Sequence, residues 1–137
     1  MDSFERFIVE NGNADTVRLV MSRREWPVPG DPGLAGLDAK SLAINTIEGR
    51  RRLRKKLPEW VACTGLVYPS SLCAEQCSSS DTARYKALIV QRIFNEYVGS
   101  GEVTSGTRKA GKIADLTGGL GVDSWAFSEV AGDVLYN

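Results

Sequence analysis

The segment that most constrains the fold is KIADLTGGLGVDS, residues 112–124, where a short apolar stretch leads into a glycine-rich turn. Apolar Ile113 and Ala114 predict a strand that ends in the acidic Asp115. Because glycine has no Cβ, the turn can adopt positive φ, and a ligand can approach its backbone. A helix that begins near Val122 directs its first N–H groups toward such a ligand. The segment therefore predicts a strand–turn–helix unit that holds a polar ligand.

Two other interpretations of this turn stay open. A dinucleotide-binding turn has the pattern G-x-G-x-x-G; Gly119 and Gly121 supply two glycines, but Ser124 stands at the third position and Asp115 has no role. An ordinary connection, with Asp123 or Ser124 capping the helix, needs no ligand at all.

After the turn, residues 125–130 predict a helix that Gly132 ends, and residues 133–137 predict a second strand. Two parallel strands are marginal alone, because parallel sheets are normally covered on both faces. We therefore expect the chain to be the N-terminal portion of a longer enzyme and to be inactive by itself. Residues 112–137 are expected to be disordered or to pair with a second copy of the chain.

The preceding residues read as helical. Short helices are expected over residues 2–11 and 14–26, and a longer one begins after the cap Asp38 and runs over residues 39–56. Their expected buried positions are Phe4, Phe7, Ile8, Val17, Val20, Met21, Leu42, Ile47, Leu53 and Leu57. A further helix, which begins among residues 78–81 and ends at Tyr97, carries the apolar stripe Ala83, Ala87, Val90, Phe94 and Tyr97. An extended connection is expected over residues 57–69, and a polar loop before residue 112.

A basic run lies at the end of the expected helix 39–56. It contains six cations, Arg50, Arg51, Arg52, Arg54, Lys55 and Lys56. Such a run can neutralise phosphates of a nucleic acid. It can equally be a solvated helix face, since cations are favoured near a helix C-terminus. Trp60 and Tyr68 could stack on bases, but we expect them to anchor a loop to the core.

Composition excludes some chemistry and names no partner. Seventeen basic and seventeen acidic residues cancel, and the absence of histidine excludes histidine-based catalysis within these residues. Three cysteines, Cys63, Cys73 and Cys77, cannot complete a four-ligand metal site, so no metal is expected. Neither a membrane-spanning apolar run nor a signal-peptide pattern is present, which predicts a cytoplasmic protein without a membrane partner.

The turn DLTGGLGVDS resembles the first motif of class I S-adenosylmethionine (SAM) methyltransferases, which is an acid at the end of strand one followed by G-x-G-x-G, with Thr117 here in place of the first glycine. Together with residues 75–86, it resembles a bacterial methyltransferase family with a helical N-terminal domain and a THUMP-like or ferredoxin-like C-terminal region. The turn also resembles the D-A-T-A-G-L-G turn of a ribosomal RNA guanine methyltransferase family.

This resemblance implies SAM as the cofactor and RNA as the substrate class. The SAM-binding residues it implies are Asp115, Thr117, Gly118, Gly119 and Gly121. It further implies that residues 76–86 fold over the cofactor with Tyr85 against it, and that Asp123 caps the helix or approaches the cofactor. Catalytic residues stay unassigned, because in the family they follow strand four.

The sequence thus predicts a mainly α fold: a helical N-terminal domain over residues 1–100, then the truncated start (strand, helix, strand) of a Rossmann-like methyltransferase α/β domain over residues 101–137. The predicted function is the N-terminal portion of a SAM-dependent methyltransferase that acts on RNA. The alternative is a helical nucleic-acid-binding module that uses residues 50–56 and has no enzymatic role.

Overall fold

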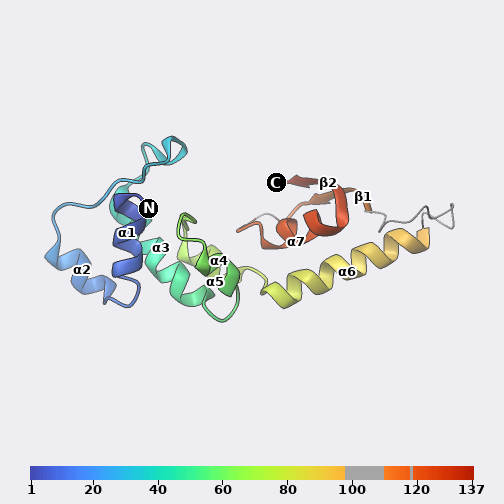
Figure 1. Ribbon diagram of the computed structural model, residues 1–137, viewed down its shortest axis with the longest axis horizontal. Helices are drawn as coiled ribbons and strands as arrows, with labels where there is room; N and C mark the ends of the chain where they lie inside the picture. Colours follow the sequence, from blue (N-terminus) through green and yellow to red (C-terminus); the bar gives the residue numbers. More distant parts are fainter. Residues whose placement is uncertain (98–109, 118) are drawn as a thin grey trace. The chain divides into compact units, whose positions relative to one another are not determined.

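The computed structural model describes residues 1–97, 110–117 and 119–137. These residues form seven α-helices, one short 3-10 helix and two strands, and they divide into two compact units (Figure 1). The first unit comprises residues 1–76 and the second comprises residues 77–137. Each unit is described by itself.

The first unit is built around one long helix. Its elements are α1 (Ser3–Glu10), α2 (Thr16–Ser22), the 3-10 helix η1 (Pro32–Leu34), α3 (Ala39–Leu53), α4 (Pro58–Ala62) and α5 (Ser71–Gln76). Helix α3 contacts α1, α2, α4 and α5. The core of this unit therefore forms on the faces of α3.

The helix starts and the main buried positions of this unit agree with the sequence. Asp2 and Glu5 form a capping box at α1, and the Asp38 carboxylate accepts a hydrogen bond from Ser41 N (2.8 Å) at the start of α3. The core cluster consists of Phe4, Phe7, Ile8, Leu42, Ala43 and Ile47. Leu53, Leu57 and Tyr68 are also buried, each no more than 1% exposed. The expected apolar faces of α1 and α3, and the anchoring role of Tyr68, are confirmed.

The expected face of α2 is wrong for Val17 and Met21, whereas Val20 is half-buried. Helix α2 is shorter than residues 14–26, and Val17 and Met21 are 66% and 83% exposed. Leu19 packs against the core cluster instead. Helix α2 has only seven residues, about two turns, so few of its residues can face the core. Its apolar spacing does not distinguish the face with Leu19 from the face with Val17 and Met21.

Helix α4 replaces the first part of the extended connection expected over residues 57–69. Pro58 opens α4, where its missing N–H removes no helical hydrogen bond. Helix α5 follows and contacts α3. Pro58 therefore begins a new helix as well as following the old one.

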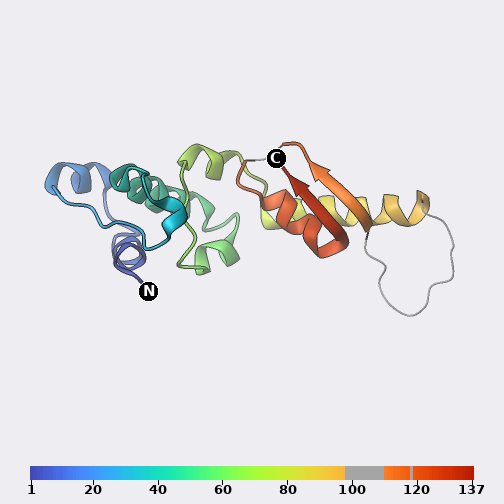
Figure 2. The ribbon, with the colours of Figure 1, turned by 90° about the horizontal axis from the view of Figure 1, so that it is seen from above.

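The second unit contains two strands and two helices. They are α6 (Ser80–Tyr97), β1 (Ala110–Asp115), α7 (Val122–Val130) and β2 (Ala131–Tyr136). The strands are parallel, with Ile113 opposite Val134 and Asp115 opposite Tyr136. Figure 2 shows both strands beside α7, which connects them along the chain. The expected elements are therefore present, a mainly α fold with a parallel strand–helix–strand unit at its end.

Helices α6 and α7 pack through small residues. Ala83 and Ala87 of α6 are buried, whereas Val90 and Phe94 are half-buried. Tyr97 is 87% exposed, so its expected place in the buried stripe is wrong. The stripe continues past the end of α7, which is half as long as α6.

Two further expectations concern the boundaries of the second unit. Helix α6 belongs with the sheet, so the boundary between the compact units does not coincide with the domain division at residue 100, which stays a prediction. Residues 112–117 and 119–137 form ordered strands and a helix, so the expected disorder is wrong there. Pairing with a second copy stays a prediction. Most of the polar loop expected before residue 112 lies outside the described residues.

Candidate functional site

The carboxylate of Asp115 organises the turn that follows β1. Asp115 is 5% exposed. Its Oδ1 accepts hydrogen bonds from Thr117 N (3.0 Å) and Thr117 Oγ1 (2.6 Å), and its Oδ2 accepts one from Ser124 Oγ (2.6 Å). Thr117 lies at the start of the turn and Ser124 lies in the first turn of α7. One side chain therefore ties both ends of the turn to the carboxyl end of the strand.

Both described glycines of the turn adopt the conformation that glycine permits. Gly119 and Gly121 each have φ +79°, in the left-handed region that other residues rarely occupy. Apart from its chain neighbours, no described atom lies within 4 Å of a Cβ placed at Gly119, whereas a Cβ at Gly121 would lie 3.7 Å from the Tyr136 ring. The turn is thus open at Gly119 and backed by β2 at Gly121. Gly118, the remaining predicted glycine, lies outside the described residues.

The end of β2 also contacts the turn. Tyr136 Oη donates a hydrogen bond to Gly119 O (2.7 Å), and Asn137 N donates one to Asp115 O (3.2 Å). Sequence reasoning did not identify Tyr136 as part of the site. A signal was available, because the second of two parallel strands joined by a helix ends at the same edge as the first.

Neither predicted cap of α7 acts as a cap. The N-cap is Gly121, with no side-chain hydrogen bond. Ser124 binds Asp115, and Asp123 binds Lys86 and Ser78, whose geometry is described below. The interpretation of the turn as an ordinary connection capped by Asp123 or Ser124 is therefore wrong in its capping. Ser124 and Asp123 bind other side chains and leave the backbone N–H groups of the helix start uncapped by side chains.

The segment expected to fold over the cofactor is the start of α6. Ser79 Oγ accepts a hydrogen bond from Thr82 N (3.2 Å), so Ser79 caps the start of α6. Tyr85 is 65% exposed and lies in the same unit as the turn. Contact of Tyr85 with a cofactor stays a prediction.

Two arginines of the basic run hold the connection between α1 and α2. Arg51 donates to Gly12 O (3.0 Å) and to Ala14 O. Arg54 donates to Asn13 Oδ1 (2.7 Å) and, more weakly, to Gly12 O (3.4 Å). These guanidinium groups satisfy backbone carbonyls that follow the C-terminus of α1.

Three more cations of the run bind other parts of the first unit. Arg50 donates to Val61 O (2.5 Å) and Cys63 O (3.1 Å), Lys56 donates to Glu75 O (2.6 Å), and Arg52 forms an ion pair with the Glu75 carboxylate. Lys55 is exposed and has no partner among the residues that the structure describes. Five of the six predicted nucleic-acid-binding cations thus contact their own unit, and their binding to nucleic acid stays a prediction.

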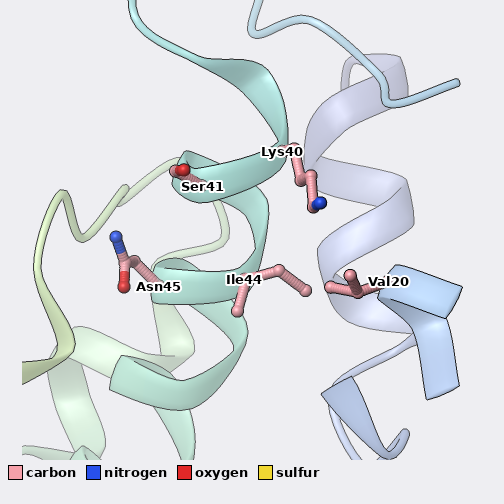
Figure 3. Close-up of a pocket in the computed structure, with 5 residues that line it drawn as sticks. All are labelled: Val20, Lys40, Ser41, Ile44 and Asn45. Atoms are coloured by element: carbon pink, nitrogen blue, oxygen red, sulfur yellow. The ribbon is translucent and has the colours of Figure 1, made fainter. Parts of the chain in front are cut away.

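A surface hollow lies in the first unit, far along the chain from the turn. It is lined by Val20 of α2 and by Lys40, Ser41, Ile44 and Asn45 of α3 (Figure 3). Asn45 Nδ2 donates to Pro69 O (2.8 Å), so part of this lining is structural. The hollow brings together none of the predicted site residues.

Over residues 1–97, 110–117 and 119–137, no group of three or more histidine, cysteine or acidic side chains is placed to hold a metal ion. Over the same residues, no helix has the length and apolar character needed to cross a bilayer.

Comparison with known proteins yields one informative likeness. Models of protein families and curated proteins gave no match. The structure is similar to the crystal structure of a protein described as a "putative methyltransferase" from Porphyromonas gingivalis W83, with a TM-score of 0.64 and 28% sequence identity. The likeness covers 98% of this chain and 27% of that chain, so this chain spans about a quarter of that protein's length. These residues therefore have a methyltransferase-like fold.

Proposed function

We propose that this chain provides the cofactor-binding turn of a SAM-dependent methyltransferase. The observation that carries the proposal is the Asp115 carboxylate, which holds both ends of a turn with two positive-φ glycines at the carboxyl end of β1. Ligands of open α/β sheets bind at this edge, outside the carboxyl ends of the strands. The likeness to the Porphyromonas gingivalis protein supports methyl transfer over hydride transfer.

In this proposal each part of the turn has a chemical role. Gly119 gives a cofactor access to the backbone, since no described atom outside its chain neighbours lies within 4 Å of its Cβ position. The first N–H groups of α7 face the same end of the sheet and favour an anionic group such as the methionine carboxylate. Asp115 keeps these groups in place and is the acid closest to a bound amino group. Methyl transfer itself is then mainly placement of the nucleophile in line with the sulfonium methyl.

RNA is the proposed class of methyl acceptor. Its support is the resemblance of the turn to that of a ribosomal RNA methyltransferase family. The alternative, a binding module that uses residues 50–56, has weaker support because five of these cations contact carbonyls and a carboxylate of their own unit. The 137-residue chain alone is proposed to be inactive, since the likeness accounts for 27% of the similar protein.

The test is calorimetric titration of SAM into the 137-residue chain and into the complete gene product, with NADH titrated in parallel. Saturable binding of SAM, and not of NADH, to the gene product is the expected result. Asp115→Ala is expected to weaken SAM binding at least tenfold, a loss of about 1.4 kcal/mol. The matched control is Asp133→Asn, because Asp133 is an exposed acid on the neighbouring strand. Absence of SAM binding to the gene product would overturn the proposal.

Because Asp115 also ties the turn, its removal could act through folding. Gly119→Ala provides a second variant, since a Cβ there touches no described atom but occupies the space proposed for the cofactor. If the folded Gly119→Ala protein and the folded Asp115→Ala protein both bind SAM as the wild type does, the turn is not the cofactor site.

A further inference from the structure

Three polar side chains from separate parts of the second unit meet beside the glycine turn. Lys86 of α6 donates from Nζ to Asp123 Oδ2 (2.7 Å) and to Ser78 Oγ (2.9 Å). Ser78, which precedes α6, donates to the same Asp123 Oδ2 (3.0 Å). We call these three residues the Lys86 cluster. It links α6, and Ser78 two residues before it, to the first turn of α7.

The Asp123 carboxylate depends on this cluster. Its side chain is 19% exposed. Its Oδ1 is shielded from solvent and has no hydrogen-bond partner among the described residues. A shielded carboxylate is costly unless a cation and hydrogen bonds compensate it. Lys86 is the cation that provides this compensation here.

A second lysine–aspartate pair in the same unit shows what is special about Lys86. Lys112 and Asp133 lie 3.7 Å apart across the two strands, with side chains 87% and 65% exposed. Exposed pairs of this kind contribute about 0–1 kcal/mol. Lys86 and Asp123 are closer, less exposed and share a hydroxyl group. The two pairs are chemically alike, so they form a natural test and control.

The other contacts between α6 and the first turn of α7 include a cation–π contact and small buried side chains. The Arg84 guanidinium of α6 lies 5.3 Å from the centroid of the Trp125 ring. The buried residues at these helices are small, chiefly Ala83 and Ala87 on α6 and Val122 and Ala126 on α7. Small side chains permit close approach but make few interlocking contacts, so a polar anchor adds to the hold on the first turn of α7. Asp123 lies two residues after the positive-φ Gly121 and directly before Ser124, which binds Asp115. The Lys86 cluster is therefore a second anchor at the end of the turn that Asp115 already holds through Ser124.

We propose that Lys86 is a positioning residue for the glycine turn: through Asp123 it holds the first turn of α7 so that the turn is preformed for its ligand. This inference deepens the proposed function and rests on it where SAM is concerned. Asp115 fixes the turn from the strand, and the Lys86 cluster fixes it from α6. Lys86 acts on the ligand through Asp123 and does not touch it.

A preformed turn affects binding more than the later chemical step. When an anchor is lost, a glycine-containing turn samples other conformations, and the ligand must restore the competent one as it binds. The SAM dissociation constant then rises by the reciprocal of the competent fraction. Once SAM is bound the geometry is restored, so kcat at saturating SAM is expected to stay within about twofold of the wild type.

The experiment compares Lys86→Met, Lys86→Arg and the control Lys112→Met in the complete gene product. SAM affinity is measured by calorimetry well below the unfolding temperature. Lys86→Met is expected to raise the dissociation constant about tenfold, Lys86→Arg to recover most of that loss, and Lys112→Met to have no effect. A lower unfolding temperature for Lys86→Met with unchanged SAM affinity would show a merely structural role and overturn the proposal.

The Asp123→Asn background separates positioning from direct contact. If Lys86 acts through Asp123, adding Lys86→Met to Asp123→Asn weakens SAM binding little further. A further tenfold loss in the double variant would mean that Lys86 touches SAM itself, and the proposal would be wrong.

A readout without ligand keeps the inference separate from the proposed function. The backbone N–H of Trp125 donates to Gly121 O (2.9 Å), so the hydrogen exchange of this amide reports on the first turn of α7. Lys86→Met is expected to speed this exchange about tenfold, and Lys112→Met is not. Unchanged exchange in Lys86→Met overturns the inference, whatever the protein binds. Faster exchange in a protein that binds no SAM leaves the positioning of the turn supported and removes the proposed function.

Discussion

The two units bury different kinds of side chain. The first unit encloses large apolar and aromatic groups, whose largest fully buried members are Tyr68, Phe4, Ile8, Ile47, Leu53 and Leu57. The buried apolar side chains of the second unit are small, and valine is the largest among them; they are Ala83, Ala87, Val122, Ala126 and Ala131. Several large apolar side chains of α6 are exposed instead, namely Tyr85, Leu88, Ile89, Ile93 and Tyr97. The first unit is held mainly by its apolar core, and the described part of the second depends more on hydrogen bonds.

The polar groups differ in the same way. In the first unit, arginines and lysines bind backbone carbonyls and fasten connections to α3 and the residues after it. In the second unit, the carboxylates of Asp115 and Asp123 collect N–H, hydroxyl and ammonium donors around one turn. Charge in the first unit therefore supports a scaffold, and charge in the second supports a site.

The largest effect is expected from a substitution that creates a cavity in the apolar core of the first unit. Ile47 is 0% exposed, and Ile47→Ala is expected to lower the free energy of unfolding of this unit by about 2–5 kcal/mol, because a cavity remains. Hydrogen exchange resolved by residue measures the loss in each unit. The exposed control Val17→Ala is expected to have an effect below about 0.5 kcal/mol. A loss below about 1 kcal/mol for Ile47→Ala would contradict the assignment of the core.

The next largest effect is expected for an arginine that binds carbonyls. Arg51→Met removes charged donors from Gly12 O and Ala14 O, and we expect the first unit to lose about 2 kcal/mol of stability. Lys55→Met in the same run is the control, with an expected change within about 0.5 kcal/mol. Chemical denaturation followed by circular dichroism measures both. Equal effects would mean that the basic run is a solvated face after all.

Two glycines with positive φ separate the cost of backbone strain from an effect on ligand binding. Gly119 (φ +79°) in the second unit and Gly36 (φ +90°) in the first both have open space around the Cβ position. Alanine at either position is expected to cost about 1 kcal/mol through its left-handed conformation. The two variants are expected to differ in SAM titration, where Gly119→Ala weakens binding and Gly36→Ala does not. Equal SAM affinity would remove the special role of the turn.

The smallest expected effect is on the stability of the first unit at low pH, through the carboxyl group of Asp2. The Glu5 amide and then the Gly30 amide donate hydrogen bonds to Asp2 and lower the pKa of its carboxyl. A lowered pKa in the folded state stabilises the first unit above the unfolded value of about 4, and this contribution is lost as the pH falls through the folded value. Asp2→Asn is therefore expected to flatten the fall in stability between pH 5 and pH 2 slightly, measured by thermal unfolding across that range. A steeper fall in the variant would contradict the sign.

Much of this contrast could be predicted from the sequence, because local signals dominate it. The cap Asp38, the inward face of α1 and the strand–turn–helix after Asp115 each depend on neighbouring residues. The hydrogen-bond partners of the basic run could not be predicted from the sequence. Its partners, such as Gly12 O and Asn13 Oδ1, lie on a connection far away in the sequence, and no local pattern reveals them.

The remaining differences come from tertiary contacts. Tyr97 has the spacing of a buried residue, but α6 extends beyond the helix that would cover it. Asp123 and Ser124 have the chemistry of caps, yet stronger donors and acceptors from α6 and β1 engage them. The RNA substrate, the cytoplasmic location and the roles of the six basic residues stay predictions.

The hydrogen bonds from Arg51 and Arg54 to the connection between α1 and α2 have a consequence for folding during synthesis on the ribosome. The chain is made from its N-terminus at about 5–20 residues per second, so α1 and α2 emerge seconds before the arginines that fasten them. Their connection stays unfastened until the end of α3 has left the exit tunnel. The first unit therefore completes its folding only after α3 has been made, and a pause in translation before residue 51 would prolong the exposure of Phe4, Phe7 and Ile8.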